Sequence, residues 1–430
     1  MNRFIYTGLL RVTAPLIFKL LERKAKRAGG TWEIRSPERF GEYAVSDSSL
    51  PVEFQRPIWV HAVSLGETRA AQPLIQALLD QGLAVLLTHM TATGREMGAS
   101  LFERYIVSGQ LKQSWIPYDL PKAVDGFFEY WQPRCGILIE REIWPNLLAE
   151  AEQRQVPMVV VSARFSVSAL KQAHWMGKVL REAFASLDLV LAQTLEDKQR
   201  LQDYGLQHVE VVGNLKFDVP IAAPLLEEAV VLKEKIQRKV VVIASTRDGE
   251  EALFLEELKN RAAEGSSMPL YVIVPRHPER FEEVRSLLDK STLSYVRRSQ
   301  HPTLAELMNS QVLLGDSLGE MFFYYGLADV AIIGGSFANF GGQNNIEASA
   351  VGVPVIVGPS TDNFKQAVKD AIAAGATLQV ENAGQGIHEA QQLLHDTSQL
   401  QVMSTAATQW MSQHRGATER TISYLQPFLK

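Results

Sequence analysis

The chain has 430 residues, of which 46% are hydrophobic and 21% are charged, and its formal net charge is -5 at pH 7. This length predicts two domains rather than one. The composition is that of a globular protein, and its balance of charge provides no basic footprint for nucleic acid. The single cysteine, Cys135, excludes an internal disulfide and a cysteine-rich metal site, and it suits a reducing compartment.

Residues 1–30 combine an apolar stretch with an excess of positive charge. Apolar side chains dominate Phe4–Leu21, interrupted by Arg11 and Lys19, and no small-residue cleavage site follows, so a removable signal peptide is not expected. The stretch is at the lower limit of length for crossing a bilayer. A helix lying in the membrane interface is favoured, with its basic flank on anionic headgroups. A true membrane span and an amphipathic helix packed on the body are the alternatives.

Short β-rich runs then alternate with helical stretches, in two successive series. Continuous rather than alternating apolar runs predict parallel strands covered on both faces, and hence two doubly wound α/β domains. The expected strands are Ile58–Ala62, Ala84–Thr88, Gly136–Ile139, Met158–Val161, Leu187–Ala192 and Val209–Val212, then Val240–Ala244, Leu270–Val274, Val312–Leu314, Val330–Ile333 and Pro354–Val357.

The boundary between the domains is expected where prolines interrupt this pattern, within Gly213–Lys235. The expected organisation is a membrane-associated helix with its basic flank (1–30), a Rossmann-like domain (31–215), a linker (216–235), a second Rossmann-like domain (236–410) and a C-terminal helix returning to the N-terminal domain (411–430).

The most informative segment is glycine-rich and follows an expected strand. Val330–Ile333 runs into Gly334-Gly335, and a second glycine pair precedes Asn344-Asn345-Ile346-Glu347. Glycines let backbone N–H groups approach an anion, and a helix opening within 338–345 would add positive potential there. Glu347 would accept hydrogen bonds from a sugar hydroxyl. This pattern is typical of nucleotide-sugar glycosyltransferases of the GT-B type, although a packed turn with a solvent-facing Glu would look the same locally.

In the first half, charged residues follow the strands at the edge where ligands bind in open parallel sheets. Glu67 follows the first strand and either completes a capping box with Ser64 or serves as a general base. Glu140 closes a buried strand, where a carboxylate needs a partner or a chemical role. Lys216 lies near the domain boundary, framed by apolar neighbours.

In the second half, Pro275-Arg276 presents a guanidinium after a strand, suited to phosphate contact. His277 is interpreted as a loop hydrogen-bonder rather than a catalyst. The segment Gly315–Met321, which includes Leu318, Gly319 and Glu320, places small residues before a helix. No P-loop motif occurs, and no cluster of His, Cys and Asp has metal-ligand spacing, so neither an ATPase nor metal-dependent transfer is expected.

Taken together, these motifs resemble the 3-deoxy-D-manno-octulosonic acid (Kdo) transferases of Gram-negative lipopolysaccharide assembly. The resemblance covers nearly the whole chain in the expected order. The matching pieces are Arg39-Phe40-Gly41, Val63–Glu67, Pro117–Pro121, Trp144–Leu147, Gly213–Asp218, Pro275–Phe281, Gly315–Glu320 and Gly341–Glu347.

The resemblance implies a GT-B enzyme that moves Kdo from CMP-Kdo to lipid IVA with inversion, without a metal or another cofactor. It implies an acceptor-binding first domain, a donor-binding second domain, and a place on the cytoplasmic side of the inner membrane. Glu67 looks like the proton acceptor, and Glu140 and Lys216 look like transition-state stabilisers. The implied CMP contacts are Pro275, Arg276, Leu318, Gly319, Glu320, Asn344, Asn345, Ile346 and Glu347.

The chain departs from the family's usual residues at four places. Arg141, Ser162 and Arg247 stand where the family commonly has Thr, Asn and His, and Asn345 replaces a Pro. Arg141 and Arg247 could therefore alter acceptor or donor contacts. Two other readings compete: another GT-B transferase or a UDP-sugar epimerase, and a membrane-tethered nucleotide-binding module that would have no use for Glu67 and Glu140.

Overall fold

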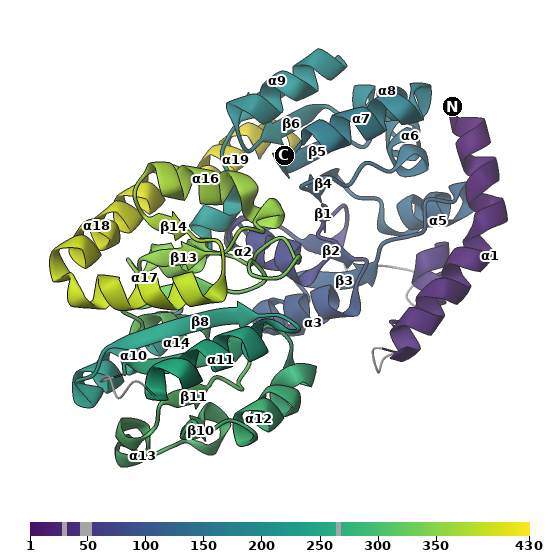
Figure 1. Cartoon of the computed structure of the whole chain (residues 1–430). Coiled ribbons are helices and arrows are strands. Elements are labelled where there is room, and N and C mark those ends of the chain that lie inside the picture. The colour runs from purple at the N-terminus through teal and green to yellow at the C-terminus, as the bar shows by residue number, and fades with distance from the viewer. Residues whose placement is uncertain (28–31, 44–53, 264–267) are drawn as a thin grey trace. The chain divides into compact units, whose positions relative to one another are not determined.

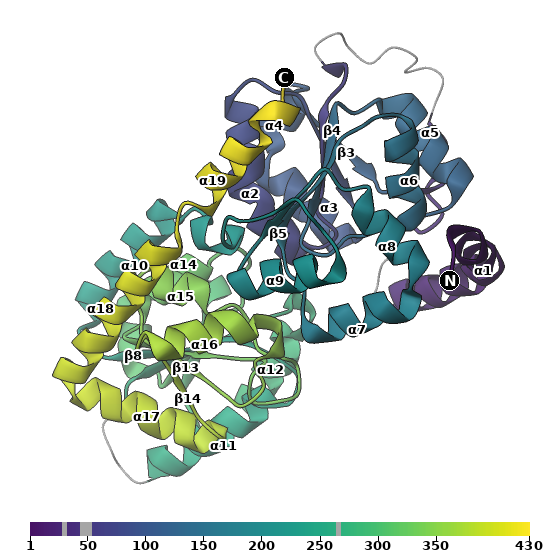
Figure 2. The same cartoon turned by 90° about the horizontal axis from the view of Figure 1, so that it is seen from above.

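The structure, a computed structural model, describes residues 1–27, 32–43, 54–263 and 268–430. The chain forms two compact units: unit 1 is Met1–Val219 with Arg415–Lys430, and unit 2 is Pro220–His414. Each unit contains a seven-stranded parallel sheet, and helices cover both of its faces (Figures 1 and 2). The predicted pair of doubly wound α/β sheets is confirmed.

The sheet of unit 1 has the strand order β3-β2-β1-β4-β5-β6-β7. Its strands are β1 (Ile58–His61), β2 (Val85–His89), β3 (Leu111–Trp115), β4 (Cys135–Ile139), β5 (Met158–Ala163), β6 (Leu189–Ala192) and β7 (Val209–Val211). Its helices are α1 (Arg3–Arg27), α2 (Leu65–Asp80), α3 (Ala92–Leu101), α4 (Glu103–Val107), α5 (Pro121–Trp131), α6 (Pro145–Gln153), α7 (Val167–Met176), α8 (Lys178–Ala185), α9 (Leu195–Tyr204) and α19 (Ala417–Leu425), with short 3₁₀ turns η1 (Pro37–Phe40) and η4 (Leu215–Asp218).

The sheet of unit 2 has the order β10-β11-β9-β8-β12-β13-β14. Its strands are β8 (Val240–Thr246), β9 (Leu270–Pro275), β10 (Tyr295–Arg297), β11 (Val312–Leu314), β12 (Val330–Ile333), β13 (Val355–Val357) and β14 (Thr377–Gln379). Its helices are α10 (Ala223–Ile236), α11 (Glu250–Ala263), α12 (Phe281–Asp289), α13 (Leu304–Asn309), α14 (Met321–Leu327), α15 (Ile346–Ala350), α16 (Lys365–Ala373), α17 (Ala383–His395) and α18 (Thr397–His414).

Successive residues of each central strand enter two different cores. Trp59 and Leu138 pack under α5 and α6, whereas Val60 and Ile139 pack under α2 and α19. Unit 2 repeats the arrangement with one core on each face of its sheet. Because both faces of these strands are buried, apolar residues occupy consecutive positions, which explains the unbroken runs in the sequence.

Three strands were absent from the sequence prediction, namely β3, β10 and β14. Each lies at an edge of its sheet, and its residues include polar or partly exposed ones, such as Lys112 and Gln113 in β3. An edge strand has one partner and is less buried, so a continuous apolar run is a poor signal for it. The other expected strands are present with ends shifted by one or two residues.

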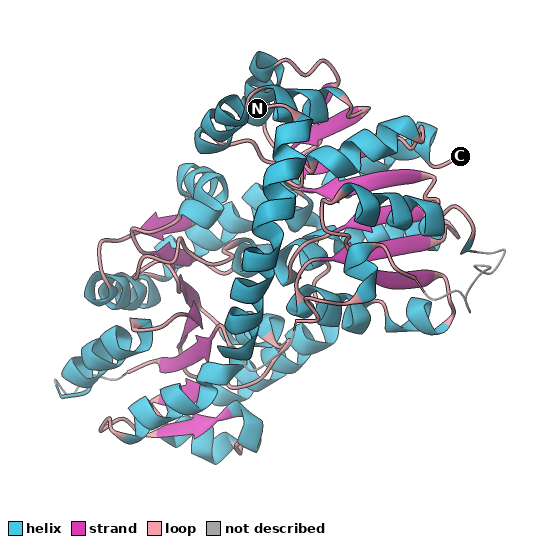
Figure 3. Cartoon of the chain, turned by 90° about the vertical axis from the view of Figure 1, so that its right-hand side faces the viewer, coloured by secondary structure: helices cyan, strands magenta, loops and turns pink. Residues whose placement is uncertain are grey.

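Helix α1 has two different faces. One face packs on unit 1: Phe18 is buried against Phe40 and Tyr118, whose rings lie 5.7 and 4.4 Å from its own. Helix α1 is the long helix that runs from the N-terminus in Figure 3. The face opposite Phe18 exposes a stripe of large apolar side chains. We call this set the outer stripe of α1; it consists of Ile5, Leu9, Val12, Leu16 and Leu20.

Polar contacts also fix α1 to unit 1. The Tyr6 hydroxyl donates to Asp119 Oδ2 at 2.8 Å, and Thr7 Oγ1 donates to Asn146 Oδ1 at 2.9 Å. Asp119 is buried and also accepts the backbone N–H groups of Asn146 and Leu147. The orientation of the outer stripe relative to the sheet of unit 1 is therefore set by specific bonds.

The C-terminal segment rejoins unit 1 through one carboxylate. Asp218, at the end of η4, accepts the backbone N–H groups of Gly416 at 2.8 Å and Thr418 at 2.6 Å, just where α19 begins. The side chains of Ala417 and Leu425 then enter the core beside α2. Asp218 thus serves as an acceptor for N–H groups that a helix start leaves unpaired.

We predict that Asp218→Ala loosens α19, because two backbone N–H groups would lose their acceptor. The expected loss is about 1–3 kcal/mol of unfolding free energy for unit 1, with faster hydrogen exchange across α19. Asp203→Ala is the matched control, since that exposed carboxylate accepts only a side-chain bond from Gln199. Equal exchange in α19 in both variants would contradict this role of Asp218.

Candidate active site

The site in unit 1 lies where the order of strands reverses. Strands β1 and β4 are neighbours, pairing Ile58 with Cys135, and the chain leaves them toward opposite edges of the sheet. Such a switch point leaves a crevice beyond the carboxyl ends of the two strands. Glu67, in the first turn of α2, follows β1, and Glu140 directly follows β4.

Glu140 and Lys216 form an ion pair within unit 1. Lys216 Nζ donates to Glu140 Oε1 at 2.7 Å, and both side chains are mostly shielded from solvent. Glu140 adopts a φ of 63°, a left-handed conformation that favours glycine. Backbone strain is thus held at the residue that carries the carboxylate, as is common at functional sites. The two residues that the sequence singled out separately are in direct contact.

Glu67 is held by the backbone rather than by the predicted capping box. Its Oε2 accepts the N–H of Val63 at 2.6 Å, whereas Ser64, the N-cap, makes no side-chain capping bond. The box fails because the carboxylate reaches back past the N-cap to the preceding residue. One oxygen of Glu67 is thus anchored at the carboxyl end of β1.

Burial raises the pKa of Glu67 from the ordinary 4.5 to about 8, and the neighbouring carboxylates of Glu140 and Glu142 act in the same direction. The Val63 N–H and Lys216 oppose the rise. A carboxylate with a pKa near the working pH is suited to accepting a proton from a hydroxyl. Burial also raises the pKa of Glu142, which accepts the Trp144 indole N–H at 2.8 Å.

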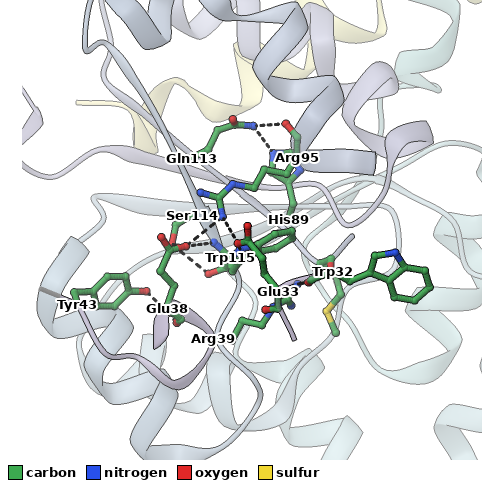
Figure 4. Close-up of polar contacts among 11 residues, drawn as sticks. Trp32, Glu33, Glu38, Arg39, Tyr43, His89, Arg95, Gln113, Ser114 and Trp115 are labelled. Carbon is green, nitrogen blue, oxygen red and sulfur yellow. Dashed lines mark hydrogen bonds and ion pairs between the residues drawn. The ribbon is translucent and has the colours of Figure 1, made fainter. Parts of the chain in front are cut away.

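A second polar cluster fastens the segment after α1 to β3 (Figure 4). Trp115 donates its indole N–H to Glu33 Oε2 at 2.6 Å and its backbone N–H to Glu38 Oε2 at 2.8 Å. The guanidinium groups of Arg39 and Arg95 lie 4.1 and 4.8 Å from the centre of the Trp115 ring. Arg39, from the first quoted motif, is therefore buried and structural in its contacts.

In unit 2, the glycine-rich loop already holds an anion, which is the carboxylate of Glu250. The backbone N–H groups of Gly335 and Phe337 donate to Glu250 at 2.6 and 2.8 Å, and that of Ala338 donates at 3.2 Å. Glu250 is fully buried at the start of α11. A side chain on Gly334 would lie 2.6 Å from the backbone of Thr246, so glycine is needed for this approach. The prediction that these N–H groups face a ligand anion is wrong for these three.

The helix expected to open within 338–345 begins just after that range. Residues 334–345 form turns and irregular chain, and α15 comprises only Ile346–Ala350, with Glu347 in its first turn. Asn344 Oδ1 accepts the N–H of Ile346 at 3.0 Å. Asn345 is fully buried, and neither its Oδ1 nor its Nδ2 has a hydrogen-bond partner among the described residues.

The other predicted donor residues follow β9 and β11, two neighbouring strands. Arg276 donates its backbone N–H to Thr246 O at 3.0 Å, which ties the loop after β9 to the end of β8. Both carboxylate oxygens of Glu320 accept from Arg298, at 2.9 and 3.1 Å, so this side chain has a structural partner. Leu318 is exposed, and Gly319 adopts a φ of 77°.

Sequence reasoning overlooked the buried charges beneath these loops. Besides Glu250, the fully buried Glu251 accepts Arg280 Nη1 at 2.7 Å and the Thr246 hydroxyl at 2.6 Å. Asp316 accepts Arg297 Nε at 2.6 Å. An available signal was the Glu250-Glu251 pair directly after a strand and Gly249, since acids there need partners.

The departure at Arg247 involves a contact with His277. Arg247 Nη1 lies 2.8 Å from His277 Nε2, and its guanidinium lies 4.6 Å from the centre of the Phe340 ring. Burial lowers the pKa of His277, and Arg247 and Arg276 act in the same direction. A neutral His277 can accept the Arg247 hydrogen bond, so Arg247 links the loops after β8, β9 and β12. No group of three or more His, Cys, Asp or Glu side chains suited to a metal occurs in the described part of the chain.

We predict that Glu250→Ala disrupts the glycine-rich loop, because several buried N–H groups would lose their shared acceptor. The expected cost is about 3 kcal/mol or more, seen as faster hydrogen exchange of Gly335–Ala338 and a lower denaturant midpoint for unit 2. Glu256→Ala, at an exposed position on the same helix, is the control. Unchanged exchange in the loop would show that Glu250 does not hold it.

Comparisons with known proteins show the family of the chain. The family model described as 3-deoxy-D-manno-octulosonic-acid transferase (kdotransferase) matches residues 35–219. The 3-deoxy-D-manno-octulosonic acid transferase of Bordetella pertussis is 52% identical over 433 residues, covering 100% of both chains. The enzyme of the same description from Haemophilus influenzae is 32% identical over 448 residues, covering 100% of this chain and 99% of its own.

The fold has wider relatives. The UDP-GlcNAc 2-epimerase of Neisseria meningitidis, solved with bound UDP-GlcNAc, superposes with a TM-score of 0.58 at 17% identity, covering 86% of this chain and 100% of that one. At this identity the likeness shows the fold alone, which is GT-B-like, as predicted. The sequence relatives span the whole chain and show more: the chain belongs to the 3-deoxy-D-manno-octulosonic acid transferases, a family of glycosyltransferases.

Proposed function

We propose that this transferase moves Kdo from CMP-Kdo to lipid IVA with inversion, with Glu67 as the general base and without a metal. The observation that carries the mechanism is the position of Glu67: its pKa is raised to about 8 beside the Glu140–Lys216 ion pair at a switch point of the sheet. Family membership supports Kdo as the transferred sugar.

In this mechanism an acceptor hydroxyl oxygen attacks the anomeric carbon of Kdo while the bond from that carbon to the CMP phosphate oxygen breaks. Glu67 takes the hydroxyl proton, and CMP leaves with the electron pair of the broken bond. Lys216, held by Glu140, steadies negative charge that develops as the donor bond breaks. Preorganised charges of this kind contribute more in a water-poor site than in solution.

The donor would be held by the loops after β9 and β11 and by the segment before α15. Arg276 supplies a guanidinium for the phosphate, while Pro275 fixes the start of that loop. Glu320 is occupied by Arg298, so the backbone of Leu318–Glu320 is the part available to a nucleotide. The buried amide of Asn345 lacks a protein partner among the described residues, which supports a polar ligand near Asn344–Glu347.

We further propose that α1 lies on the cytoplasmic face of the inner membrane rather than crossing it. Arg3–Arg23 is long and apolar enough to cross a membrane, with a mean hydropathy of 1.5. However, Phe18, Tyr6 and Thr7 bind it to unit 1 along one side. A helix attached in this way can place its outer stripe in the acyl boundary and its basic residues at anionic headgroups.

The function is tested by incubating the full chain with CMP-Kdo and following CMP release with and without lipid IVA. We expect release to depend on both, and Glu67→Gln to lower kcat by roughly 10²-fold or more, the scale of losing a general base. Release from UDP-sugars in place of CMP-Kdo would contradict the proposed donor. Full activity of Glu67→Gln would contradict the proposed base.

The rate should also depend on pH in a defined direction. Only ionised Glu67 accepts a proton, so kcat/KM should rise with pH and level off above about 8. The linked effect on stability has the opposite sign. Ionising Glu67 is less favourable in the folded state than in the unfolded state, so the free energy of unfolding falls as pH rises from 4.5 to about 8. Glu67→Gln should abolish the rate profile and flatten the stability profile, measured by denaturant titration at each pH.

Membrane association can be tested on the outer stripe without removing the buried side of α1. Val12→Ser with Leu16→Ser should weaken binding to anionic vesicles about tenfold or more, because two large apolar side chains leave the acyl boundary. Val107→Ser, which alters an equally exposed apolar residue on α4, is the control. Equal co-sedimentation of both variants with the parent chain would contradict the membrane role of α1.

A further inference from the structure

A cavity of about 350 Å³ lies in unit 1 beside the proposed catalytic residues. Its walls come from β5, β6, α7, α8 and α9, and its volume is within the range of small-molecule sites. The walls are mostly apolar and include Ala163, Phe165, Ala173, Met176, Leu180 and Phe184, with Gln172 as a polar member on α7. Several of these side chains are buried from solvent.

Charged residues also line this cavity, at the carboxyl ends of β4 and β5. Glu140, Arg141 and Glu142, the segment that directly follows β4, contribute, as does Arg164 at the end of β5. Of these residues Arg141 is exposed, whereas Glu140, Glu142 and Arg164 are half-buried, as Met176 and Leu180 of the walls are. Because Glu140 is the partner of Lys216, the charged end of the cavity adjoins the site of transfer.

Helix α1 also contributes to the lining. Tyr6 borders the cavity, and its hydroxyl is bonded to Asp119. The outer stripe begins at Ile5, the residue next to Tyr6 on α1. The backbone N–H of Val179, at the start of α8, donates to Met1 O at 3.0 Å, so the helices that wall the cavity are fastened to the N-terminus of α1. An apolar molecule leaving a membrane at α1 would therefore reach the cavity over a short path.

The chemistry of the lining selects the occupant. A sugar or nucleotide would need polar partners in the depth of the cavity, and water needs two to four, whereas the depth is formed by hydrocarbon. A hydrocarbon chain would recover the dispersion contacts that an empty apolar cavity lacks. Arg141 and Arg164 at the charged end suit the anionic headgroup to which such a chain is attached.

We propose that this cavity binds an acyl chain of the lipid acceptor and thereby positions the acceptor hydroxyl beside Glu67. This proposal rests on the proposed function, in which the acceptor is lipid IVA, a tetraacylated anionic lipid. It adds a specificity subsite: the cavity binds the acyl portion of the acceptor, while the catalytic residues act on the sugar.

The test fills the cavity and compares two acceptors. Ala169→Leu and Ala173→Leu add bulk to its α7 wall, and Ala149→Leu adds the same bulk on α6, away from this cavity. With tetraacylated acceptor in detergent, the filled variants should raise KM about tenfold or more, the scale of a few methylenes in an apolar pocket. Transfer to the fully deacylated form of the same acceptor should stay within about twofold of the parent chain. Ala149→Leu should change neither.

A direct binding measurement separates the cavity from the reaction. A fluorescent dodecanoic acid analogue should bind the parent chain and Ala149→Leu, and bind the filled variants with about tenfold lower affinity. Met176→Gln, which places an amide in the wall without adding bulk, should also weaken binding of this probe. Melting curves identify any variant that fails to fold.

Two results would overturn the proposal: unchanged KM and probe affinity in the filled variants, or equal losses with both acceptors. If the parent chain transfers to neither acceptor, the proposed function fails, whereas the fatty-acid probe still decides whether the cavity takes an acyl chain.

Discussion

The ion pair between Glu140 and Lys216 is the interaction on which the site in unit 1 depends. Three carboxylates, from Glu67, Glu140 and Glu142, gather where β1 and β4 end, and such a cluster is costly unless a cation offsets it. Lys216 reaches Glu140 at 2.7 Å from η4, a segment distant in sequence. Burial of Glu67, together with the two neighbouring carboxylates that Lys216 only partly offsets, raises its pKa and so makes it a stronger proton acceptor when ionised. Stability and reactivity therefore draw on the same charges.

Unit 2 has the opposite arrangement of polar groups. Its glycine-rich loop concentrates backbone N–H groups, which need an anion, and Glu250 supplies one from inside the fold. The loop is thereby preorganised before any nucleotide arrives. The Glu251–Arg280 pair fixes the neighbouring loop after β9 in the same manner. Buried carboxylates thus fix the conformation of these loops, and the proposed donor contacts lie on the same loops.

Helix α1 takes part in both proposals, membrane attachment and acceptor binding. Its packed side is specific, because aromatic rings and two hydrogen bonds fix it to unit 1. Its outer stripe is apolar and lacks such contacts, which suits a lipid surface. Tyr6 belongs to the packed side and also borders the apolar cavity beside Glu140. A single helix could therefore hold the enzyme at the lipid and lead an acyl chain toward the site.

The sequence by itself determined the parallel central strands, the family and the candidate residues, because buried parallel strands leave unbroken apolar runs and the motifs are local. Edge strands such as β3 were not predicted, since an edge strand need not be apolar. Only the tertiary structure decided which charges meet. Whether Glu67 bonds Ser64 or Val63, and whether Gly335 faces a ligand or Glu250, depends on side-chain reach between segments that local spacing does not encode. For the same reason the cavity beside Glu140 was invisible in the sequence, since its walls come from strands and helices far apart along the chain.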